Sequence, residues 1–72
     1  MVNRYFKYRA IGVPNEIGMI VRFLSENGYD VFRLSYDAYP FNEEARFDEA
    51  AYEALLKQDW FLKTKVDVFL TN

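Results

Sequence analysis

The sequence contains no cysteine and no histidine in its 72 residues, and this absence limits how so short a chain can be stabilised. Without cysteine there is no disulfide, and without either residue zinc and copper lose their preferred ligands. A domain of this size buries only about 60% of the surface of its unfolded chain. Stability must therefore come from apolar burial, for which 51% hydrophobic and 19% aromatic residues are suited. We expect a single domain over residues 1–72, with no cofactor.

Charge and hydropathy indicate the cellular location of such a chain. The net charge of −2 gives it no strong polyelectrolyte character. No apolar run approaches the roughly 20 residues of a membrane span, and the first residues lack the apolar stretch of a signal peptide. A secreted domain without cysteine would also lack disulfide staples. We therefore expect a cytoplasmic protein with no membrane association.

Periodicity predicts a strand, a helix and a second strand in the first half of the chain. Residues 4–11 and 30–36 alternate with period two, which is typical of strands. A helix is predicted over residues 14–27, with Pro14 in its first turn and Gly28 after its end. Its apolar stripe is formed by Ile17, Ile20, Val21 and Leu24. This unit predicts two parallel strands joined by a right-handed crossover.

The second half of the chain predicts a loop, a helix and a last strand. Residues 37–42 are expected to form the loop, with Asn42 as the cap of an acidic helix, which leaves little room for a further strand there. The inner face of this helix is expected to contain Phe47, Ala51, Ala54 and Leu55. Residues 60–70 alternate and predict a long strand. The expected fold is therefore α/β, as a two-layer α+β domain in the order β-α-β-α-β, with two helices on one face of a three-stranded sheet.

Residues 37–43 (Asp-Ala-Tyr-Pro-Phe-Asn-Glu) supply some oxygen ligands for a metal site, and one larger acidic cluster has residue types that could support acid–base catalysis. Its members are Asp37, Glu43, Glu44, Asp48, Glu49, Glu53 and Asp59. Adjacent acids point in different directions on a helix, and the spacing and central glycine of an EF-hand are missing. The sequence also has no nucleophile elbow, P-loop or dinucleotide fingerprint. We interpret the cluster as a solvated, well-capped helix face, and we expect neither catalytic residues, metal ligands nor enzyme activity.

The outward sides of the expected strands combine basic and aromatic side chains. These interaction candidates are Tyr5, Lys7, Arg9, Arg33, Phe61, Lys63, Lys65 and Phe69. An exposed apolar patch usually marks an interface, and the symmetric solution is a homodimer. A basic and aromatic face also suits single-stranded nucleic acid, although the pI near 5.0 argues against nucleic-acid binding. We expect a non-enzymatic accessory protein that forms a homodimer and binds another macromolecule, with single-stranded nucleic-acid binding as the alternative.

Two resemblances add to these expectations. Residues 11–18 (Ile-Gly-Val-Pro-Asn-Glu-Ile-Gly), a helix, and residues 26–31 (Glu-Asn-Gly-Tyr-Asp-Val) resemble the first half of an ACT-type regulatory domain. That resemblance implies a βαββαβ fold and a module that senses a small molecule. The short, cysteine-free chain, with runs such as Tyr5-Phe6-Lys7-Tyr8, also resembles small proteins encoded by prophages of Gram-positive bacteria. This second resemblance implies a host or phage protein as a partner.

Overall fold

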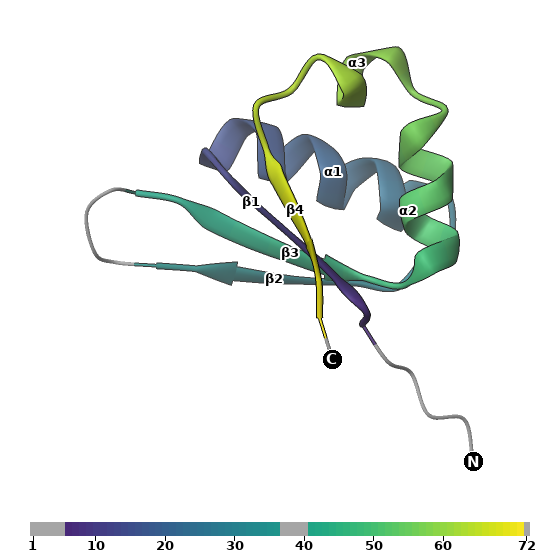
Figure 1. The fold of residues 1–72 in the computed structure, drawn as a ribbon, viewed down its shortest axis with the longest axis horizontal. Helices are drawn as coiled ribbons and strands as arrows, with labels where there is room; N and C mark the ends of the chain where they lie inside the picture. Colours follow the sequence, from purple (N-terminus) through teal and green to yellow (C-terminus); the bar gives the residue numbers. More distant parts are fainter. Residues whose placement is uncertain (1–5, 37–40, 72) are drawn as a thin grey trace.

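The computed structural model describes residues 6–36 and 41–71, which form a sheet with helices on one of its faces (Figure 1). In chain order the elements are β1 (Tyr8–Gly12), α1 (Pro14–Glu26), β2 (Val31–Ser35), β3 (Glu43–Phe47), α2 (Glu49–Leu56), α3 (Asp59–Leu62) and β4 (Asp67–Leu70). The strands are ordered β2-β3-β1-β4, and every neighbouring pair is antiparallel. Strands β1 and β2 therefore run parallel with β3 between them, which is a split βαβ arrangement.

The coarse α/β prediction is confirmed, but its count of elements is wrong. The described residues form a four-stranded sheet with three helices, whereas the sequence predicted three strands and two helices. The additional elements are β3, placed between the strands of the predicted βαβ unit, and the short helix α3. The parallel direction of β1 and β2 agrees with the prediction.

Helix α1 forms as its sequence predicts. Pro14 lies in the first turn, where its missing N–H leaves no hydrogen bond unmade. Ile17, Ile20 and Leu24 are fully buried against the sheet. Gly28 has a φ of 80°, the left-handed conformation that glycine adopts without strain, and it turns the chain from the helix towards β2.

The predicted start of the second helix is wrong, because residues 43–47 form strand β3. Ala45 and Phe47 are fully buried on the helix-covered face, and they lie opposite Ala10 and Tyr8 of β1. This is the period-two burial of a strand. Helix α2 begins only after Asp48, whose side chain accepts a hydrogen bond from the backbone N–H of Ala51 at 2.9 Å. Asp48, and not Asn42, is therefore its N-cap.

The predicted last strand is too long. Residues 59–62 form α3, and β4 covers only Asp67–Leu70. The Trp60 ring meets the Phe23 ring edge-on at 5.7 Å, while Phe61 is only 6% exposed in the core. Successive strand residues point to opposite faces, so a strand would hold one of these rings away from the core. A helical turn brings both rings to the same apolar layer.

The core lies between the helices and one face of the sheet. Its buried members are Ala10, Ile17, Ile20, Leu24, Ala45, Phe47, Ala51, Leu55 and Phe61. The Tyr8 and Tyr52 rings stack at 4.5 Å and join β1 to α2. At the end of β1, a Cβ on Gly12 would lie 2.7 Å from Cγ1 of Val66, so this close approach requires glycine. The opposite face of the sheet carries no helix in the described ranges (Figure 1).

Candidate macromolecule-binding surface

The helix-free face of the sheet, called here the open face, presents two transverse rows of side chains. Residues opposite each other in neighbouring strands project to the same side. From β2 to β4, the first row contains Phe32, Arg46, Arg9 and Phe69. The second contains Leu34, Glu44, Ile11 and Asp67. We call these the aromatic–arginine row and the Glu44 row.

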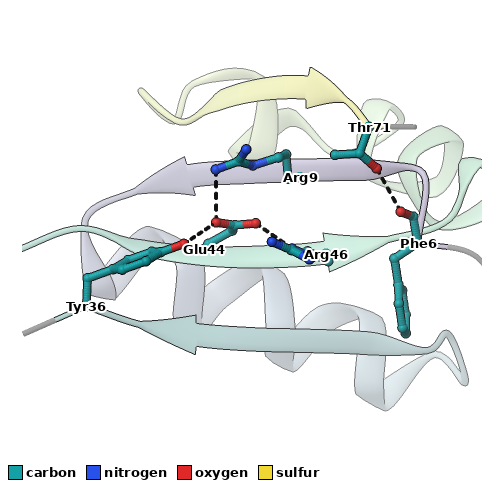
Figure 2. Close-up of polar contacts among 6 residues, drawn as sticks. All are labelled: Phe6, Arg9, Tyr36, Glu44, Arg46 and Thr71. Atoms are coloured by element: carbon teal, nitrogen blue, oxygen red, sulfur yellow. Dashed lines mark hydrogen bonds and ion pairs between the residues drawn. The ribbon is translucent and has the colours of Figure 1, made fainter.

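Glu44 is the centre of an ion-pair cluster on this face (Figure 2). Its side chain is 0% exposed. Nη2 of Arg9 donates to its Oε1 at 3.1 Å, and Nε of Arg46 donates to its Oε2 at 2.6 Å. The Tyr36 hydroxyl donates to Oε1 at 2.5 Å. Both carboxylate oxygens are therefore satisfied without solvent, as a buried charge requires.

The cluster keeps Glu44 ionised. Burial alone would raise the pKa of Glu44, but hydrogen bonds from Tyr36 and Arg46 and the charges of Arg46 and Arg9 bring it below its ordinary 4.5. The hydrogen bond to Glu44 raises the pKa of Tyr36 above 10.0. The same carboxylate raises the pKa of Arg46. At neutral pH the cluster therefore contains one carboxylate, two guanidinium groups and a neutral phenol.

Both arginines keep hydrogen-bonding capacity beyond what Glu44 uses. A guanidinium carries five N–H donors, and in the described residues Arg46 donates from Nε and Arg9 from Nη2. Nε of Arg9 is a buried atom with no hydrogen-bond partner among these residues. The Arg46 side chain is 43% exposed, and the Arg9 side chain is 36% exposed. Glu44 thus holds two guanidinium groups in place while part of each remains open to a ligand.

Aromatic rings stand at both ends of the aromatic–arginine row. Phe32 and Phe69 are each 48% exposed. Neighbouring strands lie about 4.8 Å apart, so three spacings separate the two ends of the row by about 14 Å. The Arg9 guanidinium carbon lies 5.9 Å from the Phe69 ring centroid, within the range of a cation–π contact. Tyr36, which is 45% exposed, adds a third ring beside the Glu44 row.

Only some of the interaction candidates predicted from the sequence lie on the open face. Arg9 and Phe69 lie in the aromatic–arginine row, as predicted. Lys7 continues the alternation of β1 just before the strand, and its carbonyl accepts a hydrogen bond of 2.5 Å from the Thr71 N–H. Beside it, the Thr71 hydroxyl donates to the carbonyl of Phe6 (Figure 2). These bonds tie the N-terminal end of β1 to the end of β4.

The remaining predicted residues are elsewhere. Arg33 lies on the helix-covered face, where its Nε donates to Oε2 of Glu43 at 2.6 Å. Phe61 is in the core within α3, and Lys63 and Lys65 lie between α3 and β4. Tyr5 is outside the described residues. The prediction that these side chains share one face is therefore wrong for those that the structure describes.

Arg33 was predicted on the outward side of β2. This orientation is wrong, because the pattern of the strand allows either side to face the core. Phe32, Leu34 and Tyr36 look like a buried set, yet Phe32 and Tyr36 are about half exposed on the open face. Val31 packs against the core instead. Glu44 and Arg46 were not predicted to join this surface, because the second helix was expected to begin at residue 43. Their period-two alternation with Ala45 and Phe47 is the signal that could have identified both residues.

Other parts of the described chain offer less for binding. A hollow of about 500 Å³ at the junction of β1 and α1 is lined by residues of the ACT-like motif, including Gly12, Val13 and Asn15. Its Glu16 carboxylate already accepts the backbone N–H of Lys65 at 3.1 Å. No group of three or more acidic side chains in the described residues could hold a metal ion. None of the helices that the structure describes is long and apolar enough to cross a membrane.

Comparison of the chain with models of protein families, with curated proteins and with solved structures gives no match. The functional argument therefore rests on the open face itself.

Proposed function

We propose that this chain is a non-enzymatic accessory protein that acts by binding another macromolecule on its open sheet face, and that it works as a homodimer. The observation that supports the binding role is the aromatic–arginine row. It places Phe32 and Phe69, each 48% exposed, on a sheet face that no described helix covers. Exposed aromatic rings beside arginine side chains are enriched at interaction surfaces.

The Glu44 cluster makes this face easier to cover. A charged group normally loses hydration free energy when a partner excludes water from it. Glu44 is already 0% exposed in the single chain, and its oxygens already accept three hydrogen bonds. Within this cluster, a partner therefore has to satisfy the exposed parts of Arg9 and Arg46 and does not have to pair Glu44.

The outer edge of β2 is the contact that suits the proposed homodimer. β2 ends the sheet order and has the sequence Val-Phe-Arg-Leu-Ser, without the lysine or proline that blunts many edge strands. The other edge strand, β4, is shorter and begins with Asp67. Antiparallel pairing of two β2 strands about a two-fold axis would join two four-stranded sheets and leave both open faces free.

Sedimentation equilibrium at micromolar concentration tests the dimer. We expect twice the 8.6 kDa mass of the chain. Leu34→Lys puts a charge on the edge strand outside the aromatic–arginine row, and we expect it to give monomers. The matched control is Leu62→Lys on α3, a site that is 60% exposed, which should leave the dimer intact. Observation of the 8.6 kDa species alone would refute the homodimer, and a dimeric Leu34→Lys variant would exclude the β2 edge.

A further inference from the structure

The aromatic–arginine row combines two kinds of group that can bind a nucleotide: aromatic rings and guanidinium groups. Its rings provide flat apolar faces on which bases stack. Its guanidinium groups provide forked N–H donors that match phosphate oxygens. Resting on the proposed function, we propose that the macromolecule bound by the open face is a single-stranded nucleic acid, which crosses the strands along Phe32, Arg46, Arg9 and Phe69.

The dimensions of the row agree with this ligand. The terminal rings are separated by three strand spacings, about 14 Å. Aromatic side chains on a four-stranded sheet are able to stack two or three bases of a single strand. Arg46 and Arg9 occupy the middle positions of the row, so the phosphates between the stacked bases pass over them.

The charge of the Glu44 cluster also agrees with this ligand, although the whole molecule is acidic. Two arginines against one Glu44 carboxylate leave the cluster with a net positive charge. Asp67, at one end of the Glu44 row, is the exposed acid of the two rows. Other acids lie on the helices, including Glu16 and Glu26 of α1 and Glu49 and Glu53 of α2. The net charge of −2 therefore does not describe the surface that meets the ligand.

Nucleic acid satisfies this row better than an apolar protein surface does. An apolar protein surface that covered the row would bury the exposed N–H donors of Arg9 and Arg46 that Glu44 does not use, and buried donors without acceptors are unfavourable. A phosphate backbone supplies the oxygen acceptors that these groups need. A single strand is favoured over a duplex, because paired and stacked bases cannot present their faces to Phe32 and Phe69. The rings accept any base, so we expect little sequence preference.

Fluorescence anisotropy tests the proposal with a labelled oligothymidylate of about ten nucleotides in low-salt buffer. We expect binding whose log K falls with log salt concentration at a slope near −1.4, about −0.7 for each of two phosphates. The Phe32→Ala/Phe69→Ala double variant should bind more weakly by roughly 30-fold or more, since each of the two rings loses a stacked base. Arg46→Lys keeps a charge beside Glu44 but loses the fork, and should also weaken binding.

Two control variants test whether the effect is specific to the aromatic–arginine row. Arg22→Ala removes an 80% exposed arginine from α1, and Leu62→Ala trims an exposed side chain of α3; both should bind as the parent does. Circular dichroism of every variant confirms that it is folded. The proposal is overturned by an absence of binding at low salt, by equal affinities of the double variant and the controls, or by equal binding of a duplex of the same length.

Sedimentation of the same proteins separates this proposal from the homodimer. A dimeric parent that binds no oligonucleotide, together with a monomeric Phe32→Ala/Phe69→Ala variant, would mean that a second copy of the chain covers the row. That result overturns nucleic-acid binding and retains the homodimer. A monomeric parent whose oligonucleotide binding depends on Phe32 and Phe69 would give the opposite outcome.

Discussion

Glu44 offsets a repulsion that the sheet register creates. Arg9 and Arg46 lie directly opposite each other in β1 and β3, and like charges in that position destabilise a strand pair. Glu44 accepts a hydrogen bond from each arginine and a third from Tyr36, which follows β2. One carboxylate thereby connects the side chains of three neighbouring strands. Its loss would leave two adjacent positive charges on the open face.

Stability should therefore depend on pH through this cluster. Because the folded-state pKa of Glu44 lies below its ordinary 4.5, its contribution is present above pH 4.5 and is lost as pH falls through the folded-state pKa. Because the pKa of Tyr36 is raised above 10.0, its contribution is present below pH 10.0 and is lost as pH rises through the raised value. Urea unfolding followed by circular dichroism over a pH series measures both limits.

Glu44→Gln should flatten the acid limb and lower the free energy of unfolding at neutral pH by about 2 kcal/mol, the value of a hydrogen bond to a charged group. Glu53→Gln, at an exposed position of α2, is the control and should leave the profile unchanged. A Glu44→Gln variant with the acid limb of the parent would show that the cluster does not link folding to pH.

At the scale of elements, Asp48 separates two kinds of structure that have similar composition. The Glu-Glu-Ala-Arg-Phe segment before it forms β3, and the Glu-Ala-Ala-Tyr-Glu-Ala-Leu-Leu segment after it forms α2. Asp48 itself has an extended backbone, and its carboxylate satisfies the N–H of Ala51. The position of this cap decides where the helix starts.

Asp48→Ala should lower the free energy of unfolding by about 1 kcal/mol, the usual effect of losing an N-cap. Asn42→Ala is the matched comparison, because Asn42 would be the cap if the helix began at residue 43. We expect the Asn42 variant to change stability by less than the Asp48 variant in chemical denaturation. The reverse ranking would contradict the boundary between β3 and α2.

The predictable parts of the fold are those where local pattern and tertiary environment agree. In α1 the apolar stripe, Pro14 and Gly28 all indicate the same helix. In β3 they disagree, because burial of the charged Glu44 requires hydrogen bonds from Arg9 of β1 and from Tyr36 after β2, in addition to the one from Arg46. The residues of the open face divide in the same way between those that were predictable and those that were not. Arg9 and Arg46 could be predicted from the alternation within their own strands, whereas the face on which Phe32 lies required the sheet order.

At the scale of the whole molecule, residues 6–36 and 41–71 place helices on one face of the sheet and none on the other. All of the fully buried core side chains belong to the helices or to the helix-covered face, apart from Glu44. A chain of 72 residues has little surplus with which to build a second layer. Association with another chain is an economical way to gain further stability.

The proposed homodimer gives thermal unfolding a dependence on concentration. If only the folded chain dimerises, mass action raises the melting temperature as protein concentration rises. We expect this shift over a roughly hundredfold range of concentration in the parent protein. The Leu34→Lys variant should melt at one temperature throughout the range. A concentration-independent parent would contradict coupled folding and association.

The aromatic–arginine row is the same in both directions, since Phe, Arg, Arg and Phe follow one another from β2 to β4 and from β4 to β2. A nucleic-acid strand has a 5′-to-3′ polarity, and this palindromic row offers it the same order of contacts either way round. Any preferred polarity has to come from the neighbouring Glu44 row, whose ends are apolar Leu34 and acidic Asp67. If the proposed binding holds, the aromatic–arginine row alone would retain a strand without setting its direction.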